Sequence, residues 1–265
     1  MSRHELTDQQ WEQIQPLLPK PIKRVGRPEV DPRKVLNGII FVLKTGCAWR
    51  DMPKKYGSYT TCWRRLKQWQ KWGVWERIWR KLLKQLREEQ KLDFSRGFLD
   101  GSFVASKRGG DFIGRTKVGK GSKIMVVTER NGLPVGFHVE SAQPHEIRLA
   151  EKTIQSVRIP SRRGAPKRRF TELVADRAYH SASFRSFLRK LGTKPVIPYR
   201  KNTKKEKRRP PSLGDGYKER WKVERCFAWM DNCRRLVVRY ERYIQHYKAF
   251  CLLALILLCL NRLIH

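Results

Sequence analysis

The chain has 265 residues, 40% of them hydrophobic, which is enough for one large packed domain or two modest ones. Its 59 Lys and Arg residues against 24 Asp and Glu give a formal net charge of +35, spread along the whole sequence, which favours nucleic acid as the partner. A membrane is disfavoured because no signal peptide is recognisable and the most apolar run, residues 249–260, is shorter than the roughly 20 residues of a membrane span.

The first 92 residues have the pattern of a helical domain. A helix is predicted over residues 6–18, with Thr7 as its N-cap, and a second over residues 31–44, ending at Gly46. A third helix is predicted over residues 59–71 with Ser58 as its N-cap.

The third helix is the candidate DNA reader of this domain. Its spacing turns Trp63 and Leu66 inward and gives an outward basic face, formed by Arg64, Lys67 and Lys71. Helix, turn and basic helix describe a helix-turn-helix unit whose last helix enters the major groove. The alternative is a small helical bundle with ordinary surface Lys and Arg. The Trp side chains at 69, 72, 75 and 79 have the spacing of a buried helix face.

From residue 93 onward the pattern changes to strands mixed with helices. Five β-like runs are predicted, at residues 97–104, 123–128, 133–139, 170–176 and 194–199. Asn131-Gly132 marks a hairpin turn between the second and third runs, and helices are predicted near 145–157 and 181–191. This order fits a ribonuclease H-like mixed sheet, although element order alone also fits other α/β folds.

Two turn-rich basic stretches, residues 158–169 and 200–209, are predicted to be exposed loops. Each is either a solvated charge run or a segment that binds DNA phosphates. The six cysteines include no C-x-x-C pair and no His spacing of the zinc type, so we expect small buried apolar residues of a reducing compartment.

Three carboxylates stand out by their positions. Asp100 and Asp176 each follow an apolar strand, where a charged side chain is disfavoured unless it serves a site or a turn. Glu224 is predicted on a helix that carries Tyr217 and Arg220 on the same face. Taken alone, Arg220 and Glu224 could simply form an i, i+4 ion pair.

Several motifs carry a resemblance to a known family. They are LDGSFV at 99–104, ADRAYHS at 175–181, and Y-x-x-R-x-x-x-E at 217–224 followed by RCFAW. Near the N-terminus, TDQQWEQIQPLLP and GCAWRDMPKKYGSYTTCWRRLKQW belong to the same pattern. Together these segments closely resemble transposases of bacterial insertion sequences, the insertion sequence five family and its relatives, over nearly the whole chain.

The resemblance implies a small all-α, helix-turn-helix-like DNA-binding domain over residues 1–92 and a ribonuclease H-like catalytic domain over residues 93–265. It implies that Asp100, Asp176 and Glu224 are the catalytic triad and bind two Mg²⁺ or Mn²⁺ ions. Oxygen-only ligands suit these hard cations.

The same resemblance extends to DNA contacts. It implies that Tyr217 and Arg220 contact the DNA end. The family pattern has a basic residue seven positions after the Glu, where this chain has Asp231; Arg234 or Arg235, about one turn later, could supply the charge.

For partners, the resemblance implies double-stranded DNA, both terminal inverted repeats and target, and a homodimer that pairs two ends. A cytoplasmic, nucleoid-associated bacterial protein is expected. Two alternatives remain open: a sequence-specific DNA-binding protein, either a regulator or a decayed transposase, and a hydrolytic nuclease of the same fold.

Overall fold

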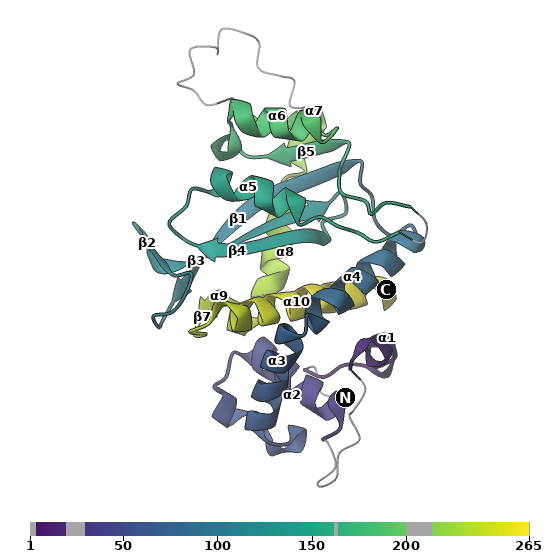
Figure 1. Ribbon diagram of the computed structural model, residues 1–265, viewed down its shortest axis with the longest axis vertical. Helices are drawn as coiled ribbons and strands as arrows, with labels where there is room; N and C mark the ends of the chain where they lie inside the picture. The colour runs from purple at the N-terminus through teal and green to yellow at the C-terminus, as the bar shows by residue number, and fades with distance from the viewer. Residues whose placement is uncertain (1–3, 20–29, 162–163, 200–213, 265) are drawn as a thin grey trace. The chain divides into compact units, whose positions relative to one another are not determined.

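The structure, a computed structural model, describes residues 4–19, 30–161, 164–199 and 214–264 and shows two compact units (Figure 1). Unit 1 consists of residues 1–82, 107–110 and 230–265, and unit 2 of residues 83–106 and 111–229. The sequence places one domain boundary between residues 92 and 93. In the structure, residues 230–264 group with the N-terminal helices in unit 1.

Unit 1 is helical. Its elements are α1 (Asp8–Ile14), α2 (Pro32–Thr45), α3 (Tyr59–Lys71), the first part of α4 (Val74–Glu88), the end of α8 (Trp221–Asp231), α9 (Arg234–Val237), β7 (Val238–Arg239) and α10 (Ile244–Ile264). Thr7 is the N-cap of α1, as the sequence predicts, and it forms a full capping box with Gln10. Gly46 ends α2 in the left-handed conformation, with φ of 71°, which favours glycine.

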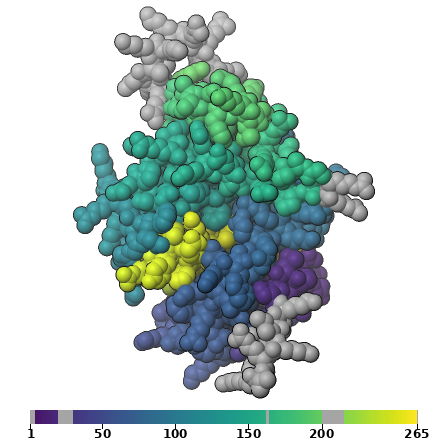
Figure 2. All heavy atoms as spheres, viewed as in Figure 1, coloured from purple at the N-terminus to yellow at the C-terminus, as the bar shows by residue number. Residues whose placement is uncertain are grey.

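Helix α10 lies in the core of unit 1. Among the described residues it is the one helix long and apolar enough to cross a membrane by length and composition, yet 67% of its most apolar window is buried. Its side chains pack against the N-terminal helices: the Phe250 ring lies 6.0 Å from that of Trp49, and Asn261 accepts a hydrogen bond from Gln10. Figure 2 shows C-terminal residues, in yellow, beside blue residues of the N-terminal part.

Two details of α3 differ from the prediction. Ser58 occupies the N-cap position, but its hydroxyl pairs with Thr60 Oγ1 at 2.6 Å instead of capping a backbone N–H. Trp63 is 38% exposed, because the buried face of α3 consists of Cys62, Leu66 and Trp69. Lys67 lies over the Trp63 ring, 4.0 Å from its centroid, and covers part of this apolar surface.

Unit 2 is built on a mixed sheet with strand order β4-β3-β1-β5-β6. Strand β1 pairs antiparallel with β3 and parallel with β5, and β6 extends the parallel part. A short β2, which the sequence analysis missed, pairs with the start of β3. The strands are β1 (Arg96–Ser106), β2 (Gly114–Thr116), β3 (Gly119–Glu129), β4 (Pro134–Ser141), β5 (Glu172–Ala175) and β6 (Lys194–Val196).

Helices cover both faces of this sheet, with α5 on one side and α8 on the other (Figure 1). The helices assigned wholly to unit 2 are α5 (Glu146–Gln155), α6 (Ala182–Lys190) and α7 (Gly214–Lys218). The hairpin turn falls at Asn131-Gly132, where Gly132 has φ of 89°. Three antiparallel strands followed by alternating helices and parallel strands form a ribonuclease H-like fold, as the sequence predicts.

Candidate active site

Strand register brings two of the predicted carboxylates to one place. Leu99 of β1 pairs in parallel with Ala175, the last residue of β5. Asp100 and Asp176 each follow directly, so they occupy neighbouring positions on adjacent strands and, by the alternation of side chains, the same face. The Asp176 carboxylate accepts a hydrogen bond from the Ala178 backbone and caps the 3₁₀ turn that follows β5.

Apolar packing places the third carboxylate over that face. Val223 of α8 packs into a buried cluster with Phe98, Val174 and Val196 of the three neighbouring strands. Phe98 and Val174 precede the two aspartates by two residues and therefore share their side of the sheet. Glu224 follows Val223 directly, so burial of Val223 holds the Glu224 backbone beside the strand ends. The Glu224 side chain itself is 54% exposed.

Arg220 joins Asp100 and Glu224. Its Nη1 lies 2.6 Å from Asp100 Oδ2, and its Nη2 lies 2.5 Å from Glu224 Oε1. One guanidinium thus bonds to two carboxylates, Asp100 of β1 and Glu224 of α8, which lie 124 positions apart in the sequence. The i, i+4 pair expected from the sequence forms, but it is part of a larger contact that includes Asp100.

The segment that carries Arg220 is a turn and not one continuous helix. The sequence places Tyr217, Arg220 and Glu224 on one helix face, whereas α7 ends at Lys218 and α8 begins at Trp221. The break lets the Arg220 side chain reach across to β1 while Glu224 stays on α8.

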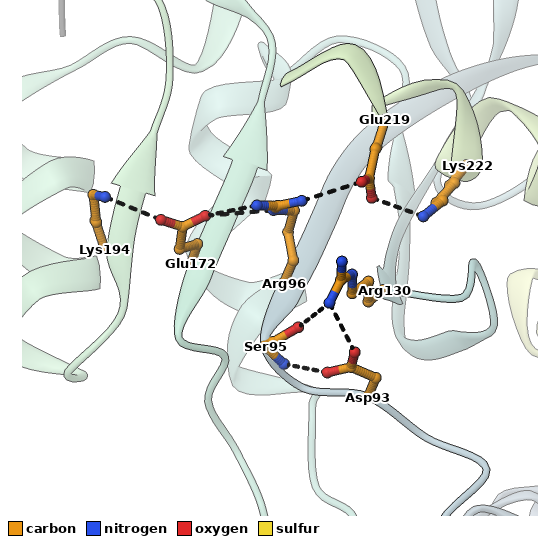
Figure 3. A network of polar contacts seen from close by, with 8 residues as sticks. All are labelled: Asp93, Ser95, Arg96, Arg130, Glu172, Lys194, Glu219 and Lys222. Carbon is orange, nitrogen blue, oxygen red and sulfur yellow. Dashed lines mark hydrogen bonds and ion pairs between the residues drawn. The ribbon is translucent and has the colours of Figure 1, made fainter. Parts of the chain in front are cut away.

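A network of alternating charges anchors this turn to the sheet (Figure 3). Arg96, at the start of β1, contacts Glu172 of β5 at 3.3 Å and Glu219 of the turn at 3.4 Å. Lys194 of β6 and Lys222 of α8 complete it, at 3.0 Å from Glu172 and 2.7 Å from Glu219. Because Glu219 precedes Arg220, the network fixes the backbone from which Arg220 extends.

A fourth carboxylate, which the sequence analysis missed, lies beside the site. A Cβ atom placed on Gly101 would be 3.0 Å from Glu146 Cδ, so the first turn of α5 approaches β1 directly after Asp100. Tyr179 is fully buried, and its hydroxyl donates to Glu146 Oε2 at 2.9 Å. The motif ADRAYHS contains Tyr179, but no signal in the sequence pairs that tyrosine with Glu146.

Burial and charge shift the acid-base properties of this cluster. Burial raises the pKa of Asp100, although the Gly101 N–H and the Arg220 guanidinium oppose the shift. Burial raises the pKa of Tyr179 strongly, and the charges of Glu146, Asp100 and Asp176 raise it further. The Tyr179 hydroxyl therefore stays protonated and serves as a donor. For Arg220, burial lowers the pKa, but Asp100 and Glu224 outweigh burial and the net shift is upward.

The donors at this place fit a hard divalent cation by their chemistry, because all of them are carboxylate oxygens. Within residues 4–19, 30–161, 164–199 and 214–264, no three His, Cys, Asp or Glu side chains are gathered closely enough to hold a metal ion. In this arrangement Arg220 supplies the positive charge between Asp100 and Glu224.

The other predicted DNA contacts fall into two groups. Arg64, Lys67 and Lys71 lie on the outward side of α3, and Arg234 is exposed. Arg235, in contrast, is buried: it pairs with Glu241 at 2.8 Å and donates to the Cys47 carbonyl, so its charge is used inside unit 1.

Several other expectations can be compared with the structure. Tyr217 packs against the apolar cluster under α8. Asp231 is the last residue of α8 and is exposed.

All six cysteines are free thiols, and five are buried. The basic stretch 200–209 lies outside the described residues, as do residues 162–163 of the other basic stretch.

Comparison with known families agrees with this geometry. Residues 6–79 match the family described as "Putative transposase of IS4/5 family", and residues 91–260 match the family described as "Transposase DDE domain". The second match covers more than half of the chain. The family uses divalent metal ions and acts on DNA.

Similar proteins occur in insertion elements of Burkholderia cepacia. The chain is 44% identical over 122 residues to "Insertion element IS402 uncharacterized 16.2 kDa protein", covering 44% of this chain and 83% of that protein. It is 35% identical over 144 residues to "Putative transposase for insertion sequence element IS402", covering 54% of this chain and 64% of that protein. It is also 33% identical over 69 residues to "Uncharacterized protein y4sN" of Sinorhizobium fredii, covering 26% of this chain and 55% of that protein.

The chain thus spans less than two thirds of the length of the last two relatives. The match to the catalytic family model nevertheless extends through both aspartates, Arg220 and Glu224, and the fold around them is the one that this family requires. The chain belongs to the DDE transposases of the IS4/5 family.

Proposed function

We propose that this chain binds the terminal inverted repeats of an insertion sequence and catalyses metal-dependent strand cleavage and strand transfer. Asp100, Asp176 and Glu224 are the proposed catalytic carboxylates. The observation that carries the proposal is the meeting of Asp100 and Glu224 on Arg220, at the strand edge where Asp176 also lies.

A different set of contacts holds each of the three carboxylate residues in place. Asp100 is held within the middle of the sheet, Asp176 by its hydrogen bond to the following turn, and Glu224 by the packing of Val223 under α8. Carboxylate oxygens drawn together to 4 Å would repel by roughly 4 kcal/mol per pair at an effective dielectric of 20. A bound cation would offset this repulsion.

The proposed cofactors are two Mg²⁺ or Mn²⁺ ions, held by Asp100, Asp176 and Glu224. When bound, they would activate the attacking water and stabilise the leaving oxygen of a phosphodiester. Arg220 presents two N–H groups in fixed directions, which suits a DNA phosphate as well as the two carboxylates. Tyr217 and Arg234 are proposed as further contacts to the DNA.

The same residues serve both steps. Water is the nucleophile in cleavage and the freed 3′-hydroxyl is the nucleophile in joining, so the carboxylates act on the same kind of phosphorus centre twice. Neither step requires a covalent enzyme intermediate, and no Ser or Tyr nucleophile is proposed. Because two element ends must be held together for transfer, a homodimer is the proposed active form.

The test is cleavage and joining of a labelled duplex that carries the element's end, in Mg²⁺ or Mn²⁺, by wild type and Glu224→Gln. Glu88→Gln is the matched control, because Glu88 also follows a basic partner by four residues on a helix, with Lys84 at 3.6 Å. We expect nicking and joining by wild type and the control, and binding without cleavage by Glu224→Gln.

Other outcomes select the alternatives. Binding without cleavage by the wild-type chain in either metal would identify a DNA-binding protein of the regulator or decayed type. Cleavage without joining of supplied 3′-hydroxyl ends would identify a hydrolytic nuclease.

A further inference from the structure

A groove in unit 1 lies between the basic face of α3 and the first turn of α10. Its volume is about 650 Å³. One wall carries Arg64, Lys67 and Lys71 of α3, and the other carries Gln245 and His246 of α10. We call it the α3–α10 groove. Of these two walls, the sequence predicts DNA contacts for the α3 wall only, whereas the structure brings a segment about 180 positions later to the same place.

Side-chain contacts hold the two walls together. Gln70 of α3 donates to Gln245 of α10 at 3.2 Å. The His246 ring lies edge-on to two exposed aromatic rings, 6.3 Å from Trp63 and 5.4 Å from Tyr243. These contacts join the two helices through polar and aromatic groups that are partly open to solvent.

Buried arginine side chains hold the segment before α10 in place. Arg239 has no exposed surface, and its guanidinium donates to the carbonyls of Glu241 and Arg242 at 2.9 and 3.1 Å. Arg235 pairs with the Glu241 carboxylate at 2.8 Å. Two buried arginines thus hold a short loop in one conformation.

The side chains that this loop presents to solvent suit a nucleic acid. Tyr240 and Tyr243 are 41% and 55% exposed, and Arg242 between them is exposed. No Asp or Glu is among the described residues that line the adjoining groove. Basic, amide and aromatic groups on a rigid backbone can pair with phosphates and sugars at low cost in conformational entropy.

We propose that α3 enters the major groove and that the first turn of α10 and the preceding loop form the second half of the DNA-binding surface, contacting the duplex backbone beside that groove. The inference rests on the proposed function and extends it, because it assigns Arg242, Gln245 and His246 to the binding of the terminal repeat. The occupant is double-stranded DNA, whose phosphates meet both walls of the α3–α10 groove.

The experiment measures binding of the full chain to a labelled end duplex over a range of salt concentrations. Gln245→Glu adds one negative charge to the groove without changing the side-chain size, and Arg242→Gln removes one positive charge. Gln9→Glu on α1 and Lys81→Gln on α4 are the matched controls, since both residues are exposed and neither lines the groove. Thermal melting verifies that each variant is folded.

We expect Gln245→Glu and Arg242→Gln to weaken binding by about tenfold each and the controls to bind within about twofold of wild type. Arg242→Gln should also lower the salt slope by about one unit, the value for one phosphate contact. Equal binding by a single strand of the same sequence would overturn the duplex assignment.

The two proposals fail in different ways. If Lys67→Ala weakens binding while Gln245→Glu and Arg242→Gln bind like wild type, the second half of the surface is refuted and the proposed function stands. If wild type does not bind the end duplex, the proposed function fails and this inference fails with it.

Discussion

The charge of Asp176 can be removed without loss of the hydrogen bond that its side chain makes in the fold. Its carboxylate caps the turn after β5 through the Ala178 N–H, and an asparagine side chain can accept the same hydrogen bond. We therefore predict that Asp176→Asn keeps its melting temperature and its affinity for the end duplex but loses cleavage by at least about a hundredfold, as expected for a charge needed only in the reaction. Retained cleavage would remove Asp176 from the triad.

Tyr179 is predicted to act through Glu146. Tyr179→Phe removes the hydrogen bond that positions the Glu146 carboxylate near Asp100, so we expect cleavage to fall by about 10- to 100-fold with unchanged binding of the end duplex. The Mn²⁺ concentration for half-maximal cleavage should rise, and Glu146→Gln should show the same change. A melting temperature lowered without any change in the Mn²⁺ dependence would indicate a structural role only.

The residues of the candidate site and the predicted DNA contacts differ in how well the sequence predicts their surroundings. Asp100, Asp176 and Glu224 stand in motifs, and their positions on strands and a helix follow from local pattern. Glu146 and Arg235 depend on partners far along the chain: Glu146 meets Gly101 and Tyr179, and Arg235 meets Cys47. Spacing in the sequence carries no information on such pairs, which explains why one was missed and the other was expected to face DNA.

At the scale of elements, the turn between α7 and α8 depends on the charge network in Figure 3. Lys222 and Arg96 lower the pKa of Glu219, and Lys194 and Arg96 lower that of Glu172. A lowered carboxyl pKa contributes stability above the unfolded value of about 4.3, and that stability is lost as the pH falls through the folded pKa.

We predict that Glu219→Gln lowers the free energy of unfolding by about 1 kcal/mol at pH 7, or the melting temperature by about 2–4 °C. The difference from wild type should become smaller as the pH falls from about 4.3 through the lowered folded pKa of Glu219. Thermal melting at pH 7 and pH 3.5 measures it, with Glu88→Gln as the surface control. A difference that is equally large at the two pH values would contradict this account.

Most elements could be predicted from local pattern, because the strands and helices of unit 2 carry clear periodicity and the hairpin has its Asn-Gly turn. The local pattern could not reveal which other element packs against each face of a helix or strand. Trp63 fits the inward stripe of an isolated α3, yet the buried stripe is shifted to Cys62, Leu66 and Trp69. Likewise, the helical spacing of Tyr217 and Arg220 does not reveal the break at residues 219–220, where Glu219 contacts Arg96 of β1.

At the scale of the whole molecule, unit 1 joins both ends of the chain. Helix α10 buries 13 of its residues, and its neighbours include α1, α2 and α3. We predict that a fragment of residues 1–92, although it contains the helix-turn-helix pattern, unfolds without a cooperative transition because it lacks this helix.

Circular dichroism during heating tests this prediction. The full chain serves as the positive control. A co-expressed segment of residues 230–265 that restores a cooperative transition to the fragment would support the packing of unit 1. A sharp transition in the fragment alone would show that the N-terminal helices fold without α10.

Under the proposed function, this packing makes recognition of DNA depend on the synthesis of α10, which follows Glu224 in the sequence. While the ribosome is still adding the catalytic segment, α10 has not been made, and the N-terminal helices lack the partner that completes their core. A product that ends before α10 would therefore neither occupy an element's end nor shield it from a chain that contains this helix. Only a chain that already carries Glu224 could reach the DNA, so each protein that finds an end would also be equipped to cut it.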